Sequence, residues 1–133
     1  MGGWADPEAM VIAYLTEHLP ERLTPDPFGP PMQVAFATAV PDPRPDRLVR
    51  VMLSGSERRT VVHRRSKITI EAWSDHGEAD ASALMEAVYN TLDAWQLVPP
   101  FDGWPSGPYQ QTDPKTSTSR YIATCIVQHR AQE

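Results

Sequence analysis

The stretch that decides the fold is residues 67–95, KITIEAWSDHGEADASALMEAVYNTLDAW. Its first seven residues alternate between two faces, as the side chains of a β-strand do. One face carries Ile68, Ile70 and Ala72, and the other carries Thr69, Glu71 and Trp73. After residue 74 the apolar period becomes that of a helix. The switch predicts a strand that leads directly into a helix packed on the sheet.

The second part of this stretch predicts an amphipathic helix that ends near residue 96. Ser74 or Asp75 is a suitable N-cap, and Glu78 follows Asp75 by three residues, as in a capping box. Asp80 adds negative charge near the helix N-terminus, which the helix dipole favours. The apolar stripe consists of Ala81, Leu84, Met85, Val88, Leu92 and Trp95. We expect this stripe, with Trp73 from the strand, to lie in the core.

Two further extended stretches precede residue 67. Residues 48–54 alternate, residues 54–56 (Ser-Gly-Ser) predict a turn, and residues 59–63 predict a second strand. No helical segment separates these stretches from residues 67–73, so they predict an antiparallel meander. The apolar face of the first stretch consists of Val49, Val51 and Leu53.

The two ends of the chain complete the predicted fold. Asp6 can cap a first helix over residues 6–19, with Pro7 in its first turn. Residues 120–129 alternate and predict a last strand, and the polar tail after them is expected to fray. The fold class is therefore α+β: an antiparallel or mixed sheet of about four strands with two flanking helices, in the order α-β-β-β-α-β.

Two proline-rich loops separate these elements, at about residues 20–47 and 98–118. Proline cannot donate a ladder hydrogen bond, so neither loop predicts a regular strand, except that residues 32–40 can form an extended stretch. Long irregular segments in a compact domain commonly carry function or pack on a neighbour. Residues 41–47 and 99–114 within these loops are therefore candidate contact segments.

Composition limits the class of function. The chain has 133 residues, of which 41 % are hydrophobic and 22 % charged, as expected for one globular domain spanning residues 1–133. Its net charge of −5 argues against a dedicated nucleic-acid binder. The N-terminus lacks the pattern of a signal peptide, and no apolar run approaches membrane-spanning length. We expect no membrane partner and a protein made and used in a cytoplasm.

A search for reactive groups predicts no catalytic, cofactor or metal site, and so no enzyme. The single cysteine, Cys125, lies among apolar residues and is expected to be a buried thiol. No HExxH, GxSxG or phosphate-binding glycine motif occurs. His76 lies near Asp75, Glu78 and Asp80, but these acidic residues are also what a helix N-terminus favours. We therefore interpret that cluster as capping chemistry rather than as a site.

The candidate contact residues are basic or aromatic. Arg58, Arg59, Arg64 and Arg65, with Lys67 beside them, bracket the second predicted strand. This cluster is either a surface that faces an anionic partner or a solvated hairpin that keeps sheet edges apart. The further candidates are Arg50, Trp104 and Tyr109. For Trp104 a packing role is the alternative to a contact role.

Three features in order resemble the tail terminator proteins of long-tailed phages, especially those of actinobacterial hosts. They are the strand LVRV at residues 48–51 ending in Ser54-Gly55, the strand and helix from Ile68 to Trp95, and Asp113-Pro114 followed by Arg120-Tyr121 and a final strand. The resemblance covers about residues 7–130. It carries over no residue role, because contact residues in that family are not fixed by a motif.

The resemblance implies a mixed α/β domain without catalytic residues that forms a hexameric ring at the head-proximal end of the tail tube. The ring stops tube polymerisation and offers a surface to the head–tail connector, and DNA can pass through its lumen. The implied partners are therefore copies of the chain itself, the major tail tube protein and the head–tail connector protein. The implied location is the virion tail, assembled in the host cytoplasm.

Two alternatives stay open at this point. One is a head–tail connector or tail-completion protein of the same assembly, whose sequence would have a similar character. The other is a small-ligand-binding regulatory α+β domain, which would need an apolar pocket with a few converging polar groups.

Overall fold

The computed structural model describes residues 3–4, 6–23, 33–41, 43–58, 63–95, 104, 106–112, 114 and 118–132. The elements in these ranges are β1 (Gly3–Trp4), α1 (Pro7–His18), the 3-10 helix η1 (Leu19–Arg22), β2 (Ala35–Ala37), β3 (Arg47–Arg58), β4 (His63–Ser74), α2 (Glu78–Trp95), β5 (Ser106–Gln110) and β6 (Ser119–Gln132). The predicted α+β class with two α-helices is confirmed, and the described sheet has six strands rather than about four.

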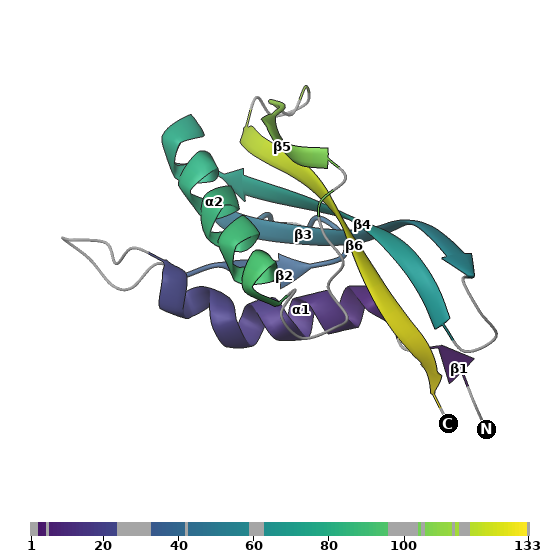
Figure 1. Cartoon of the computed structure of the whole chain (residues 1–133). Coiled ribbons are helices and arrows are strands. Elements are labelled where there is room, and N and C mark those ends of the chain that lie inside the picture. Colours follow the sequence, from purple (N-terminus) through teal and green to yellow (C-terminus); the bar gives the residue numbers. More distant parts are fainter. Residues whose placement is uncertain are drawn as a thin grey trace.

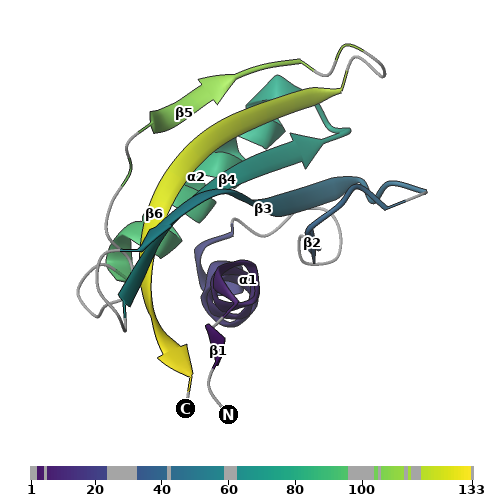
Figure 2. The ribbon, with the colours of Figure 1, turned by 90° about the vertical axis from the view of Figure 1, so that its right-hand side faces the viewer.

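Three long antiparallel strands, β3, β4 and β6, form the middle of a mixed sheet with the order β1-β6-β4-β3-β2 (Figures 1 and 2). The short strand β2 lies parallel to β3, and it forms within the extended stretch predicted at residues 32–40. Both β1 and β5 pair antiparallel with β6. The predicted antiparallel pairing is confirmed for β3 and β4, but the predicted three-stranded meander is wrong, because residues 63–74 form a single strand and β6 follows only after α2 and β5.

Both α-helices pack on one face of the sheet, where they enclose the core (Figure 1). Because alternate strand residues point to that face, the sheet side of the core is drawn from every second position. The strand residues of this core are Val49, Val51, Ile68, Ile70, Ala72, Ala123, Cys125 and Val127, and the buried helix residues include Val11, Leu15, Ala81, Leu84, Met85, Val88 and Leu92. The predicted stripe on the second helix is confirmed, and the Trp95 ring stacks on Tyr14 of α1 at 4.2 Å.

The two helices begin differently. Asp6 caps α1 as predicted, since its Oδ1 accepts hydrogen bonds from the backbone amides of Glu8 and Ala9 at 3.0 and 3.3 Å. The capping box predicted for α2 is wrong, because that helix begins only at Glu78. Gly77 precedes it with a φ of 103°, and its carbonyl accepts from the amide of Ala81.

The strand boundaries required correction at the β3–β4 hairpin. The turn predicted at residues 54–56 is wrong, because β3 continues to Arg58 with a register shift between Leu53 and Gly55. Leu53 lies just before this bulge and keeps its register with Ile68, but it is 46 % exposed instead of buried. The two strands predicted at residues 59–63 and 67–73 are also corrected: β4 is continuous from His63, and residues 59–62 lie outside the described ranges.

Both ends of the sheet also extend further than expected. A strand, β5, forms within the predicted loop at residues 98–118, although it contains Gly107 and Pro108. Its ladder with β6 shifts register between Ser106 and Tyr109, so Pro108 is accommodated where regular pairing is interrupted. The tail expected to fray is instead part of β6 as far as Gln132, which pairs with Gly3.

Candidate subunit-contact surfaces

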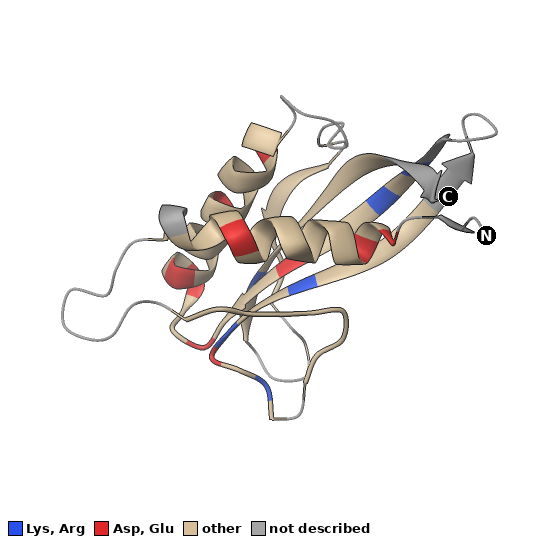
Figure 3. Cartoon of the chain, turned by 90° about the horizontal axis from the view of Figure 1, so that it is seen from below, with Lys and Arg blue, Asp and Glu red and all other residues tan. Residues whose placement is uncertain are grey.

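Charge is divided between the two layers of the molecule. Neither α-helix contains lysine or arginine, whereas both carry carboxylates. The described arginine and lysine side chains belong instead to the sheet and to the segment before β3: Arg44, Arg47, Arg50, Arg65, Lys67 and Arg120. Figure 3 shows acidic residues on the helices and mainly basic residues on the strands, with acidic residues also on one strand and in the loops. The helices thus carry carboxylates without lysine or arginine, and the described cations belong mainly to the sheet.

Several of these arginines form ion pairs within the molecule. Two of them pair with the buried carboxylate of Glu71. This side chain is 7 % exposed and accepts from Nη1 of Arg50 at 3.3 Å and Nη1 of Arg120 at 3.2 Å. It also accepts from the indole N–H of Trp73 at 3.2 Å. Because the arginines lie on β3 and β6 and Glu71 on β4, the network ties the three central strands together. Arg50, a predicted contact residue, is therefore engaged in an ion pair within the sheet.

Trp73 is buried beside this network, as predicted for a core residue. The guanidinium carbons of Arg120 and Arg44 lie 5.0 and 5.4 Å from the centre of its ring. These distances are within the range of cation–π attraction. Arg44 also donates to Asp75 at 2.8 Å and to the Thr118 hydroxyl at 2.9 Å, which joins three segments distant in sequence.

A second network forms where α2 begins. Arg47 donates to Asp80 through Nε at 3.0 Å and Nη2 at 3.3 Å, and the Ser74 hydroxyl also hydrogen-bonds to Asp80. Burial acts to raise the pKa of Asp80, but the hydrogen bonds from Arg47 and Ser74 outweigh it and hold that pKa below its usual 3.8. The acidic residues near His76 therefore act in structural pairing, and among the described residues no group of three or more His, Cys, Asp or Glu could hold a metal ion.

The predicted basic cluster lies at the end of the β3–β4 hairpin. The register places Arg58 opposite Arg64, and Arg64 opposite His129 of β6. Arg59 and the side chains of Arg58 and Arg64 lie outside the described part of the chain. We call Arg65 and Lys67, together with the register positions of Arg58 and Arg64, the hairpin surface.

On the hairpin surface Lys67 is exposed, and its ammonium group has no ion pair among the described residues. Arg65 is partly exposed, lies two positions before Lys67 in β4 and is paired in register with Glu57 and Gln128. Because two-residue spacing in a strand preserves the face, both residues belong to the same side of the sheet. Their neighbours Ser66 and Ile68 are buried on the helix side, so the hairpin surface includes cations on the side away from the helices.

The aromatic candidates lie near a groove that sequence reasoning did not predict. Trp104 stacks on Tyr89 of α2 at 4.5 Å, which gives it the packing role, and Tyr109 is half-exposed on β5. Between α2 and the strands β5 and β6 is a groove of about 450 Å³. Its lining, which we call the α2–β5 groove, consists of Ser82, Met85, Glu86, Tyr89, Asn90, Pro108 and Tyr121.

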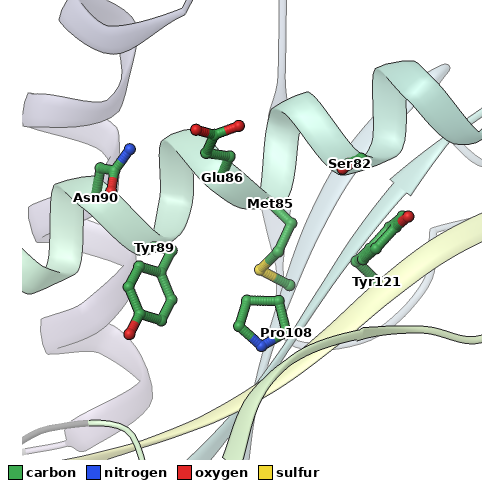
Figure 4. Close-up of a pocket in the computed structure, with 7 residues that line it drawn as sticks. All are labelled: Ser82, Met85, Glu86, Tyr89, Asn90, Pro108 and Tyr121. Atoms are coloured by element: carbon green, nitrogen blue, oxygen red, sulfur yellow. The ribbon is translucent and has the colours of Figure 1, made fainter.

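Figure 4 shows how the α2–β5 groove is built. Met85 and Tyr89 extend from α2 toward Pro108, while Glu86 and Asn90 lie along the outer edge of the helix. Met85 is buried and forms part of the floor, whereas Glu86 and Asn90 are exposed. The combination of aromatic faces with a rim carboxylate suits a cationic side chain better than a neutral apolar ligand.

Cys125 is buried in the core, as predicted, and burial raises the pKa of its thiol from 9.0 to about 12. A thiol in that environment stays protonated at neutral pH and does not act as a nucleophile. In the helices that the structure describes, none is both long and apolar enough to cross a membrane.

Comparison with known proteins adds no family. No protein-family model matches the chain, and no curated protein matches it at a significant level.

Proposed function

We propose that this protein is a tail terminator: a structural virion protein that forms a ring, with six subunits, at the head-proximal end of a phage tail tube. In this role the ring ends tube polymerisation and provides the surface that joins the head–tail connector. The partners are copies of the same chain, the major tail tube protein and the connector protein. The protein acts without a catalytic or cofactor site.

The observation that supports this proposal is the division of charge within one chain. A closed ring requires heterologous contacts, in which each subunit presents two different and complementary surfaces. The outer side of α2, which carries carboxylates, and the hairpin surface, which carries Arg65 and Lys67, are two such surfaces on separate parts of the molecule. Complementary potentials of this kind select the orientation of the contact and speed association.

The sheet edges fit a subunit that remains soluble before it assembles. The outer strand β2 has only three residues, and β5 contains Pro108 and a register shift. Short edge strands and prolines limit open-ended pairing between sheets. Contacts through side-chain surfaces are therefore favoured over continuous strand addition.

The choice of a tail role over other ring-forming roles comes from the resemblance across residues 7–130. The α2–β5 groove favours a protein contact over the small-ligand alternative, because Glu86 and Asn90 line an exposed edge rather than converge on an enclosed volume.

Charge reversal tests the proposal. We expect the variant with Arg58, Arg59, Arg64 and Arg65 all changed to glutamate to lose ring formation and tail joining, because its hairpin would then repel the acidic helices. Circular dichroism and thermal unfolding would confirm that the monomer folds, and electron microscopy would score rings and joined tails. A matched variant with the same four positions changed to lysine keeps the charge and should assemble. Unchanged assembly of the glutamate variant would contradict a role for the hairpin charges.

A further inference from the structure

We propose that the α2–β5 groove binds the hairpin surface of a second copy of this chain, with Glu86 of one subunit facing Lys67 of the next. This inference rests on the proposed function, since it assigns the two surfaces that meet between neighbouring subunits of the ring. Most described charged groups are engaged inside the molecule, whereas Glu86 and Lys67 have no ion pair among the described residues.

On the acidic side, Glu86 is the uncompensated group at the groove. Asp80 is engaged by Arg47, and the carboxylate of Glu78 accepts from the Tyr121 hydroxyl at 3.3 Å. The carboxylate of Glu86 is exposed and has no hydrogen-bond or ion-pair partner among the described residues. Since α2 contains no lysine or arginine, nothing on the helix neutralises it.

The rest of the groove has the chemistry that accepts a long cationic side chain. Tyr89 is held by stacking on Trp104, with ring centres 4.5 Å apart and an interplanar angle of 16°. Tyr121 and the thioether of Met85 continue the apolar lining (Figure 4). Lysine and arginine bury their alkyl stems on such surfaces while the charged end pairs with a carboxylate.

On the basic side, Lys67 is a cation for which the described residues provide no ion pair. Arg44, Arg47, Arg50 and Arg120 are engaged with Asp75, Asp80 and Glu71. By contrast, the Lys67 ammonium group is exposed and unpaired within the described ranges. The register adds the positions of Arg58 and Arg64 at the same hairpin end.

The two surfaces of a single subunit cannot meet each other. Ile68 and Ser66 are buried toward the helices, so Lys67 lies on the opposite side of the sheet from α2 and Glu86. A contact between the hairpin surface and the α2–β5 groove is therefore one between two copies of the chain. Because the two surfaces differ, the contact is head-to-tail, which generates a ring when the rotation between subunits closes.

The sequence makes a sharp chemical test possible. Its lysines are Lys67 and Lys115, so a carbodiimide, which joins an amine to a carboxylate in direct contact, gives few products. We would mix unlabelled and ¹⁵N-labelled protein, both concentrated alone and bound to tail tubes, and identify cross-linked peptides by mass spectrometry. The expected product joins Lys67 to Glu86 with one light and one heavy peptide. Absence of a mixed-isotope Lys67–Glu86 product from both samples would overturn the proposal.

Charge exchange provides an independent measurement. We expect Glu86→Lys to weaken self-association at least about tenfold in sedimentation experiments, as like charges would then meet, and Lys67→Glu in the same chain to restore it. Glu17→Lys changes the net charge equally on the exposed side of α1 and should leave association unchanged. Equal effects of Glu86→Lys and Glu17→Lys would overturn the assigned contact.

The outcomes separate this inference from the proposed function. If the protein forms rings that cap tubes but the cross-link joins Lys67 to a carboxylate other than Glu86, the contact between Lys67 and Glu86 is overturned and the tail role stays intact. A Lys67–Glu86 product from a protein that has no effect on tube length would support the docking pair and contradict the tail role.

Discussion

Replacement of Glu71 by glutamine should destabilise the protein without altering its surface. The carboxylate of Glu71 accepts from Arg50, Arg120 and Trp73 at 3.2 to 3.3 Å, and the side chain is 7 % exposed. The amide of glutamine keeps one acceptor oxygen, which can retain either the two bonds that Oε1 accepts from Arg50 and Trp73 or the single bond that Oε2 accepts from Arg120. The negative charge that pairs with the two arginines is lost.

The size of the effect follows from the exposure of the partners. A hydrogen bond to a charged group contributes about 1.5–3 kcal/mol, and truncation of a fully buried ion pair costs about 3–5 kcal/mol. The side chains of Arg50 and Arg120 are 28 % and 14 % exposed, so water can partly solvate them in the variant. We therefore expect a loss of about 2–3 kcal/mol, which for a domain of this size lowers the melting temperature by roughly 6–12 °C.

The assay is urea-induced unfolding followed by tryptophan fluorescence and circular dichroism, with the free energy obtained by linear extrapolation. The matched control is Glu17→Gln, an exposed carboxylate on α1 that should change the free energy of unfolding by less than about 0.5 kcal/mol. A Glu71→Gln variant as stable as this control would refute the structural role assigned to the network.

Three further predictions concern single positions. Gly77→Ala should lower the free energy of unfolding by about 1–2 kcal/mol, because φ is 103° there; an unchanged melting temperature would contradict this. The ion pair of Asp80 should add to the free energy of unfolding above pH 3.8, and this stabilisation should be lost as pH falls through the lowered pKa of Asp80. Asp80→Asn should therefore make the free energy of unfolding fall less steeply at acidic pH. The same dependence in the variant and the unaltered protein would count against the ion pair. Burial raises the pKa of Cys125 to about 12, so the thiol should react with a thiol reagent only after unfolding; rapid labelling of the native protein would contradict its burial. The buried neutral thiol should add to the free energy of unfolding below pH 9.0, and this stabilisation should be lost as pH rises toward 12.

Side-chain periodicity was sufficient to predict the core but not the strand boundaries. The alternation of residues 67–73 and the apolar stripe of α2 correspond to the observed buried faces, because burial on one face imposes those periods. The turn predicted at residues 54–56 was wrong because small polar residues also suit a bulge, which depends on the partner strand. No strand was predicted at β5, because Pro108 disfavours regular pairing. The strand forms because these residues lie beside β6 in the folded chain.

The surfaces proposed for subunit contact were only partly predictable. The basic cluster was visible as a run of arginines, and the continuous hairpin brings its positions together. The role of Arg50 was not visible, because its partner Glu71 and the second arginine come from two other strands. The α2–β5 groove could not be predicted without β5, since Pro108 and Tyr121 meet α2 only in the folded chain.

Electron microscopy of the purified protein mixed with tail-tube subunits tests the central proposal most directly. The account predicts sixfold rings at one end of the tubes and tubes that stop growing when the protein is added. Tubes that grow to the same lengths with and without the protein, and that carry no ring, would contradict it.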